Sequence, residues 1–227
     1  MRLTEEGRER IAAAVAEAEA RTTGEIVCVL ARRVSSYPEV PIGWAAAAAL
    51  LLPPLLVALG VQPLFVSRLL GEWVIGHAAA IERIVGLAIG GYALLQGAIF
   101  MAVALLVSIP EVRRLLTPRP LKARRVHAAA RQQYLATGLH LSGARTGVVI
   151  FASFDDHWVE VVADPLIHGR CGEAVWARAV EAVRSGMKRR DAAGGFVEAV
   201  GVCADALAQH FPDDGGENRL SDRPLEV

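Results

Sequence analysis

Two long stretches of the chain contain no charged residue. They cover residues 40–67 and 84–110 and are rich in leucine, alanine and valine. A helix needs about 20 apolar residues to cross a hydrocarbon core of ~30 Å, so each stretch is long enough to span a membrane. We therefore expect a transmembrane helical hairpin over residues 41–110, with spans at about 43–66 and 84–109.

The pattern inside the two spans predicts how they pack. Pro53 and Pro54 predict a kink or a break in the first span, because proline has no N–H to donate to the preceding turn. Small residues recur on one face of the second span, at Gly86, Gly90, Ala93 and Gly97. Such faces let membrane helices approach closely, so we expect this strip to pack on the first span, with a partner protein as the alternative.

Basic residues beside the spans predict their orientation. Arg32 and Arg33 precede the first span, and the connector between the spans balances its arginines with glutamates. A basic cluster follows the second span: Arg113, Arg114, Arg119, Lys122, Arg124 and Arg125. The positive-inside rule then places both termini in the cytoplasm and the short connector outside. The same cluster is expected at the lipid surface, where each cation gains about 1 kcal/mol.

The remaining chain shows helix and strand patterns in two pieces, residues 1–40 and 111–211. In the first piece, Thr4 is a candidate N-cap before a helical pattern, and a β-branched run follows Gly24. The second piece predicts a helix, a β-hairpin and two closing helices, at about 121–139, 145–154 with 157–164, 173–187 and 191–211.

Neither piece alone has the elements for a stable core, so the two are expected to form one domain. The order of elements predicts a small α/β layered domain split by the membrane hairpin. Residues 212–227 lack periodicity and are expected to be a disordered tail.

Composition excludes several classes of function. The 227 residues are 53% hydrophobic, and 24 Lys and Arg balance 24 Asp and Glu, so no basic excess favours nucleic acid as a partner. The cysteines, Cys28, Cys171 and Cys203, lie in apolar runs and are expected to be reduced. No phosphate-binding glycine loop, nucleophile elbow or Cys-x-x-Cys pair occurs, so we expect no cofactor and no catalytic residue.

Three aspartates form the best acidic constellation for a metal ion. Asp155 and Asp156 fall in the predicted hairpin turn, and Asp164 falls at the far end of the next strand. Hard cations bind several carboxylate or carbonyl oxygens, so such a site would need backbone groups or Glu173 to complete it. The alternative is that these aspartates hydrogen-bond their own turns.

Several strings resemble the TPM-domain family, in the bacterial branch where a transmembrane hairpin interrupts the domain. They are RTTGEIVCVL, RTGVVIFASF, WVEVVAD followed by Ile167, and the closing helices that end at AQHFP. The resemblance covers nearly all of the chain outside the membrane spans. It implies a small α/β/α sandwich. The family's roles include photosystem maintenance in thylakoids, an accessory subunit of a ligand-gated channel, and a phosphatase activity with divalent-cation binding.

The chain departs from the family pattern at two positions that bear on metal binding. Many relatives carry Asp-Asn-Gly where this chain has Arg145-Thr146-Gly147, and a glycine-rich turn where it has Asp164-Pro165-Leu166. A cation thus replaces a carboxylate, which disfavours both metal binding and hydrolysis.

With the bacterial branch that the resemblance implies, the leading hypothesis is an integral accessory or scaffold protein of the bacterial inner (plasma) membrane. Its cytoplasmic TPM-like domain is expected to bind or maintain a membrane protein complex. Its partners are then the lipid bilayer and another membrane protein. The alternative is a membrane-tethered, divalent-cation-dependent phosphatase, and a third option is an assembly factor for one membrane complex.

Overall fold

The computed structural model describes residues 3–59, 78–139, 147–213 and 221–227. The chain divides into two compact units. An α/β unit contains Met1–Ser36 and Pro118–Val227, and a helical unit contains Tyr37–Thr117. The chain thus leaves the α/β unit after its first strand and returns to it after the helical unit.

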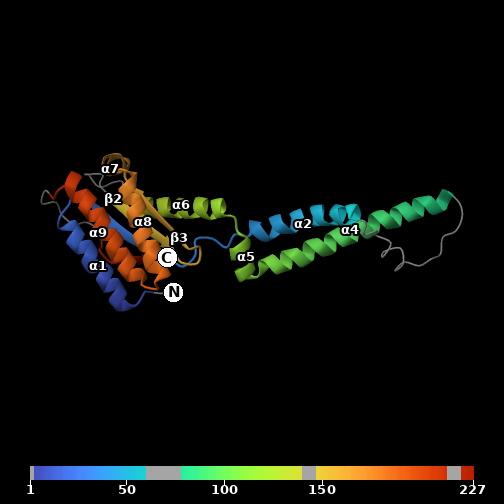
Figure 1. The fold of residues 1–227 in the computed structure, drawn as a ribbon, viewed down its shortest axis with the longest axis horizontal. Coiled ribbons are helices and arrows are strands. Elements are labelled where there is room, and N and C mark those ends of the chain that lie inside the picture. The colour runs from blue at the N-terminus through green and yellow to red at the C-terminus, as the bar shows by residue number, and fades with distance from the viewer. Residues whose placement is uncertain (1–2, 60–77, 140–146, 214–220) are drawn as a thin grey trace. The chain divides into compact units, whose positions relative to one another are not determined.

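A four-stranded mixed sheet in the order β3-β2-β1-β4 forms the centre of the α/β unit (Figure 1). Strand β1 (Glu25–Ala31) runs parallel to β2 (Gly147–Ser153), and β2 runs antiparallel to β3 (Trp158–Ala163). The β2–β3 pairing confirms the predicted hairpin, and the mixed sheet with its helices confirms the α/β class. Because β1 pairs with β2, the first piece of the chain supplies an inner strand to a sheet built mostly from the second.

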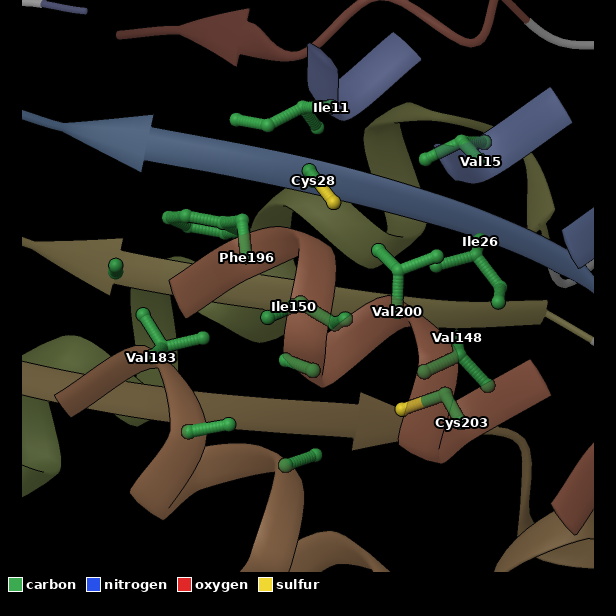
Figure 2. Close-up of a cluster of buried hydrophobic side chains, with 14 of the residues drawn as sticks. Ile11, Val15, Ile26, Cys28, Val148, Ile150, Val183, Phe196, Val200 and Cys203 are labelled. Atoms are coloured by element: carbon green, nitrogen blue, oxygen red, sulfur yellow. The ribbon is translucent and has the colours of Figure 1, made fainter. Parts of the chain in front are cut away.

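Three helices cover one face of the sheet. They are α1 (Glu5–Glu19), α8 (Glu173–Lys188) and α9 (Ala192–His210). In Figure 2, Phe196 and Val200 of α9 lie over the side chains of β1 and β2, among them Ile26 and Ile150. All four of these side chains are at most 1% exposed, which accounts for the continuous apolar runs of β1 and β2.

Helix α6 (Arg119–Ala136) covers the opposite face of the sheet. Its buried residues Val126, Ala130 and Tyr134 recur every four positions and pack against Val149 and Phe151 of β2. The sheet therefore has helices on both faces, which buries β2 completely.

Two short elements of the α/β unit are absent from the sequence-based expectation. Helix α7 (Pro165–Cys171) follows β3, and strand β4 (Leu225–Glu226) pairs in parallel with β1. The prediction of a disordered tail is wrong for this last segment, because Val227 exchanges backbone hydrogen bonds with Leu30 and Arg32. A two-residue strand has no periodicity to recognise, and its bonds use backbone groups that every residue carries. Residues 214–220 of the predicted tail lie outside the described residues.

The helical unit consists of α2 (Glu39–Ala58), α4 (Ala78–Ser108) and the short α5 (Pro110–Leu116). Helices α2 and α4 pack against each other, and α2 and the Ala88–Ser108 part of α4 are long and apolar enough to cross a membrane. Only 6% of the most apolar window of α4 is buried, which a core helix of a soluble protein would not show. The first predicted span reaches residue 66, but residues 60–77 lie outside the described residues.

The strip of small residues on α4 does not make the predicted contact with α2. A Cβ added at Gly86, Gly90 or Gly97 would meet no atom within 4 Å, and Ala93 is exposed. In α2, buried positions recur every four residues: Pro41, Ala45, Ala49 and Pro53. In α4, the buried positions include Gly91, next to the predicted strip, and Val107.

Candidate functional site: a groove beside the edge strand

A groove of about 830 Å³ lies beside β3 in the α/β unit. Its lining comes from residues 156–161 of the β2–β3 turn and β3, from Arg119 and Lys122 in the first turn of α6, from His168 of α7, and from one face of α8 between Glu173 and Arg184. The groove thus has an edge strand along it and a helix from each face of the sheet as its walls.

The backbone of β3 is open toward this groove. Asp164 donates its backbone N–H to the carbonyl of Gly147, which fixes the alternation of hydrogen bonds along the antiparallel pair. The even-numbered residues of β3 bond to β2, so Val159, Val161 and Ala163 direct their N–H and C=O groups away from it. No strand in the described part of the chain pairs with that edge.

Trp176 forms an apolar part of the α8 wall. Its side chain is almost fully buried, and its ring stacks on that of His168 with centroids 6.2 Å apart. Among the described residues, the indole N–H of Trp176 has no hydrogen-bond acceptor. This wall therefore holds an unused hydrogen-bond donor. Leaving such a donor buried without an acceptor costs about 1–3 kcal/mol.

The charged groups of the groove differ in how they are engaged. Glu160 of β3 hydrogen-bonds His127 of α6 over 2.9 Å and accepts from the indole of Trp158 over 3.4 Å. Arg184 is 3.8 Å from Glu181, and an ion pair of this length between exposed side chains contributes little to stability. Arg119 makes no ion pair with any residue that the structure describes.

Asp155 and Asp156 fasten the end of β1 to the turn between β2 and β3. The buried Asp156 carboxylate accepts from the hydroxyl of Ser153 over 2.6 Å and from the backbone N–H of Val34 over 3.3 Å. Asp155 pairs with Arg33 at 3.3 Å. Both carboxylates therefore have protein partners, and the sequence alternative of structural turn aspartates accounts for them.

Asp164 lies at the opposite end of β3, so the structure does not bring the three aspartates together. It caps α7 by accepting from the backbone N–H of Leu166 over 2.9 Å, and it accepts from the buried hydroxyl of Tyr134 over 3.2 Å. A strand rises about 3.3 Å per residue, which separates Asp156 from Asp164 by roughly 20 Å or more. Within the described residues, no group of three His, Cys, Asp or Glu side chains fits a metal ion. Arg145 and Thr146 lie outside the described residues.

The basic cluster after the second span divides between the two units. Arg113 and Arg114 belong to α5 of the helical unit, whereas Arg119, Lys122, Arg124 and Arg125 belong to α6 of the α/β unit. Sequence reasoning assigned all six to the lipid surface. The structure places two of them, Arg119 and Lys122, in the lining of the groove.

Outside the groove, burial shifts the pKa of four groups. Desolvation raises the pKa of the Glu19 carboxyl to about 7, against a hydrogen bond from the backbone N–H of Ile26 that lowers it. Burial also raises the pKa of the Cys28 and Cys171 thiols and brings that of Cys203 to about 12. All three cysteines are free thiols, as the sequence predicted, and none has the lowered pKa of a reactive thiolate.

The groove was not predicted from the sequence, although the sequence did contain a signal for β3, the edge strand that lies along it. The alternation in WVEVVA predicted a strand with one polar face, but only the strand order places that strand at an edge. The walls join residues from α6 and α8, which are more than 50 positions apart in the chain.

Comparison with known proteins supports the fold. No family model matches the chain, and no curated protein matches it. Among solved structures, the chain is similar to the NMR structure of the BA42 protein from the psychrophilic bacterium Bizionia argentinensis, with a TM-score of 0.55 and 14% identity. The similarity covers 100% of this chain and 97% of that one. At this level of identity the likeness concerns the fold alone.

Proposed function

We propose that the protein is an integral membrane accessory or scaffold protein, anchored by the α2–α4 hairpin. Its α/β unit is a TPM-like sandwich that lies in the cytoplasm and binds or maintains a membrane protein complex. The bilayer is that of a bacterial inner membrane.

The observation that carries this proposal is the apolar outer surface of α2 and α4. Leu51 of α2 and Leu94 of α4 are 67% and 77% exposed, and many other leucines of the pair are exposed as well. A soluble protein rarely exposes apolar patches of more than a few hundred Å². Lipid solvates such a surface without cost, and a paired helical hairpin satisfies its backbone hydrogen bonds internally.

The orientation rests on the distribution of arginine and lysine. Arg32, Arg33, Arg113 and Arg114 flank the cytoplasmic ends of the hairpin, while the connector has no excess of basic residues. This arrangement puts both pieces of the α/β unit on the same side, where they complete one sheet.

An accessory role fits the α/β unit better than the phosphatase alternative. The candidate carboxylates Asp155, Asp156 and Asp164 are divided between the two ends of β3 and are occupied by protein donors. The groove beside β3 instead offers open backbone groups and an apolar patch at Trp176 and Val180, which are features of a protein-binding surface.

Cysteine labelling in intact cells tests the anchor and its orientation. In a Cys171→Ser background, Gly76→Cys in the connector is expected to react with a membrane-impermeant maleimide from outside. Arg178→Cys on the exposed side of α8 is expected to react only after permeabilisation. Labelling of both positions from the same side would contradict the hairpin.

Purification tests the accessory role. A specific membrane protein is expected to co-purify with the full chain in mild detergent, and its complex to be depleted in cells that lack the chain. Phosphatase activity of the pure protein that requires Mg²⁺ and is lost in Asp156→Ala would support the alternative instead.

A further inference from the structure

The two edges of the sheet differ in how they are covered. Strand β4 pairs with β1 at one edge, whereas β3 forms the other edge and, in the described part of the chain, pairs with no strand on its outer side. Folded proteins usually block such an edge with proline, a bulge or inward-facing charge. β3 has no proline, and its one charged residue, Glu160, is held by His127 of α6. The outer side of β3 is therefore open to strand addition, and it faces the groove.

We propose that the groove binds an extended, acidic segment of the partner protein, which joins the sheet as a strand antiparallel to β3. This inference rests on the proposed accessory function and names the surface and the partner chemistry. Main-chain hydrogen bonds to Val159, Val161 and Ala163 hold the segment, and its alternate side chains pack on Trp176 and Val180.

The α6 wall places its cations near the start of β3. His127 contacts Glu160 and Tyr134 contacts Asp164, so α6 and β3 run in the same direction. Arg119 precedes His127 by eight residues, which is about 12 Å along a helix. Arg119 and its neighbour Lys122 therefore lie at the end of the groove where β3 begins.

The α8 wall adds another cation at the same end. The stacking of Trp176 on His168 places the first turns of α8 beside α7, which follows the end of β3. Helix α8 therefore runs back along β3, and Arg184 lies about 12 Å from Trp176 toward the start of the strand. Glu173, the first residue of α8, lies at the opposite end.

This charge pattern selects the segment and its direction. Asp156 also lines this end, but its carboxylate is buried and accepts hydrogen bonds from Ser153 and Val34. Arg119 has no ion-pair partner among the described residues, and Arg184 is only loosely paired, so carboxylates of the partner complement that end. In an antiparallel addition, the carboxyl-terminal side of the segment meets the start of β3. The acidic residues should therefore lie toward the carboxyl-terminal side, and a neutral or basic residue should lie beside Glu173.

Fluorescence anisotropy of defined peptides tests the proposal on the full chain in zwitterionic lipid nanodiscs. The probe is a labelled, amidated peptide of about nine residues with alternating valine and threonine, a lysine at its amino side and two aspartates at its carboxyl side. One control peptide exchanges the charges between the ends. A second carries N-methyl groups on alternate residues, which removes the N–H groups that face β3.

Substitutions in the two walls test the contacts. Arg119→Glu and Arg184→Glu are each expected to weaken probe binding by about tenfold, because they place like charges together. Arg178→Glu, on the same helix as Arg184 but outside the groove, should change it by less than about twofold. Val161→Pro removes a backbone N–H that faces the groove and should abolish probe binding. Where this variant does not fold, the N-methylated peptide tests the same main-chain hydrogen bonds.

Several results would overturn the proposal. No probe binding would refute the groove as a peptide site, and equal binding of the N-methylated peptide would refute strand addition. If Arg178→Glu and Arg184→Glu weakened probe binding equally, the acidic peptide would be held by the general charge of the surface and not by the groove. Loss of binding in anionic nanodiscs would show that lipid headgroups occupy the cations. Each result leaves the membrane anchor and the co-purifying complex untouched, so failure of the groove is distinct from failure of the proposed function.

Discussion

The side-chain amide of Gln96 in α4 donates to the backbone carbonyl of Ala49 in α2 over 3.2 Å. In an unbroken helix that carbonyl accepts from the N–H four residues later, but the residue there is Pro53, which has none. Gln96 therefore supplies the donor that the proline removes. This bond satisfies the carbonyl in an apolar setting, and α2 continues through both prolines without the predicted break.

The substitution Gln96→Leu should destabilise the hairpin by about 1–2 kcal/mol, because it leaves the Ala49 carbonyl without a donor. Adding Pro53→Ala should remove most of that loss, since an alanine at this position has a backbone N–H to donate along the helix. Unfolding in mixed micelles, followed by far-ultraviolet circular dichroism, measures both effects.

Pro54→Ala is the matched control for this pair. It restores a donor to a different carbonyl and should not rescue Gln96→Leu. If Gln96→Leu lowered stability by the same amount with and without Pro53→Ala, Gln96 would not be the donor that replaces the missing N–H of Pro53.

Local pattern was sufficient to predict most elements of the fold. The offset of four between Phe196 and Val200 predicted α9, and the alternation around Glu160 predicted β3, because these periods reflect one-sided burial. The prediction that the two pieces share one domain followed from a core that neither supplies alone, whereas the pairing of β1 with β2 was not predicted.

The predictions that failed concern contacts between residues that are distant in the sequence. Gly86 and Gly90 share a face with the correct spacing, but spacing does not say which face of α4 meets α2. The aspartates of the proposed metal site are near in sequence, yet Asp156 and Asp164 stand at opposite ends of a strand. The groove exists only because α6 and α8 lie on opposite faces of an edge strand, which no local pattern records.

The crossing of α8 and α9 depends on Gly186. A Cβ at this position would lie 2.5 Å from the Cα of Gly195 and 2.7 Å from the carbonyl oxygen of Asp191, both backbone atoms that cannot move aside. We expect Gly186→Ala to destabilise the α/β unit by about 1–3 kcal/mol through overpacking. Denaturant unfolding of the full chain in detergent, followed by tryptophan fluorescence, to which Trp176 in α8 contributes, provides the measurement.

Gly201 in α9 is the control for Gly186. A Cβ there meets no atom within 4 Å, so Gly201→Ala should stabilise the protein by about 0.5–1 kcal/mol through helix propensity. Similar losses in both variants would show that the helix crossing does not depend on the missing side chain.

The raised pKa of Glu19 predicts a pH dependence of stability. Burial is the main cause, and the neighbouring carboxyls of Asp222 and Glu25 act in the same direction. Between the ordinary glutamate pKa of 4.5 and about 7, the folded state binds more protons than the unfolded state. The contribution of Glu19 is therefore fully present below the lower value and is lost as the pH rises through about 7.

Glu19→Gln should remove this contribution while keeping an acceptor for the Ile26 N–H. The free energy of unfolding, measured at several pH values, should then fall less steeply between pH 4.5 and 7 than in the wild type. Glu17→Gln, an exposed change in the same helix, should leave the slope as it is. An unchanged slope in Glu19→Gln would assign the pH dependence to other groups.

Asp155 and Asp156 distinguish a structural turn from a metal site. Asp156→Ala leaves the fully buried Ser153 hydroxyl and the Val34 N–H without their acceptor, and it should cost about 1–3 kcal/mol. Asp155→Ala removes only a partly exposed ion pair and should cost less than about 1 kcal/mol. Because the carboxylates already have protein partners, Mg²⁺ or Ca²⁺ should leave the unfolding midpoint of the wild type unchanged. A midpoint that rises with the cation in the wild type but not in Asp156→Ala would show that the turn binds metal and would favour the phosphatase alternative.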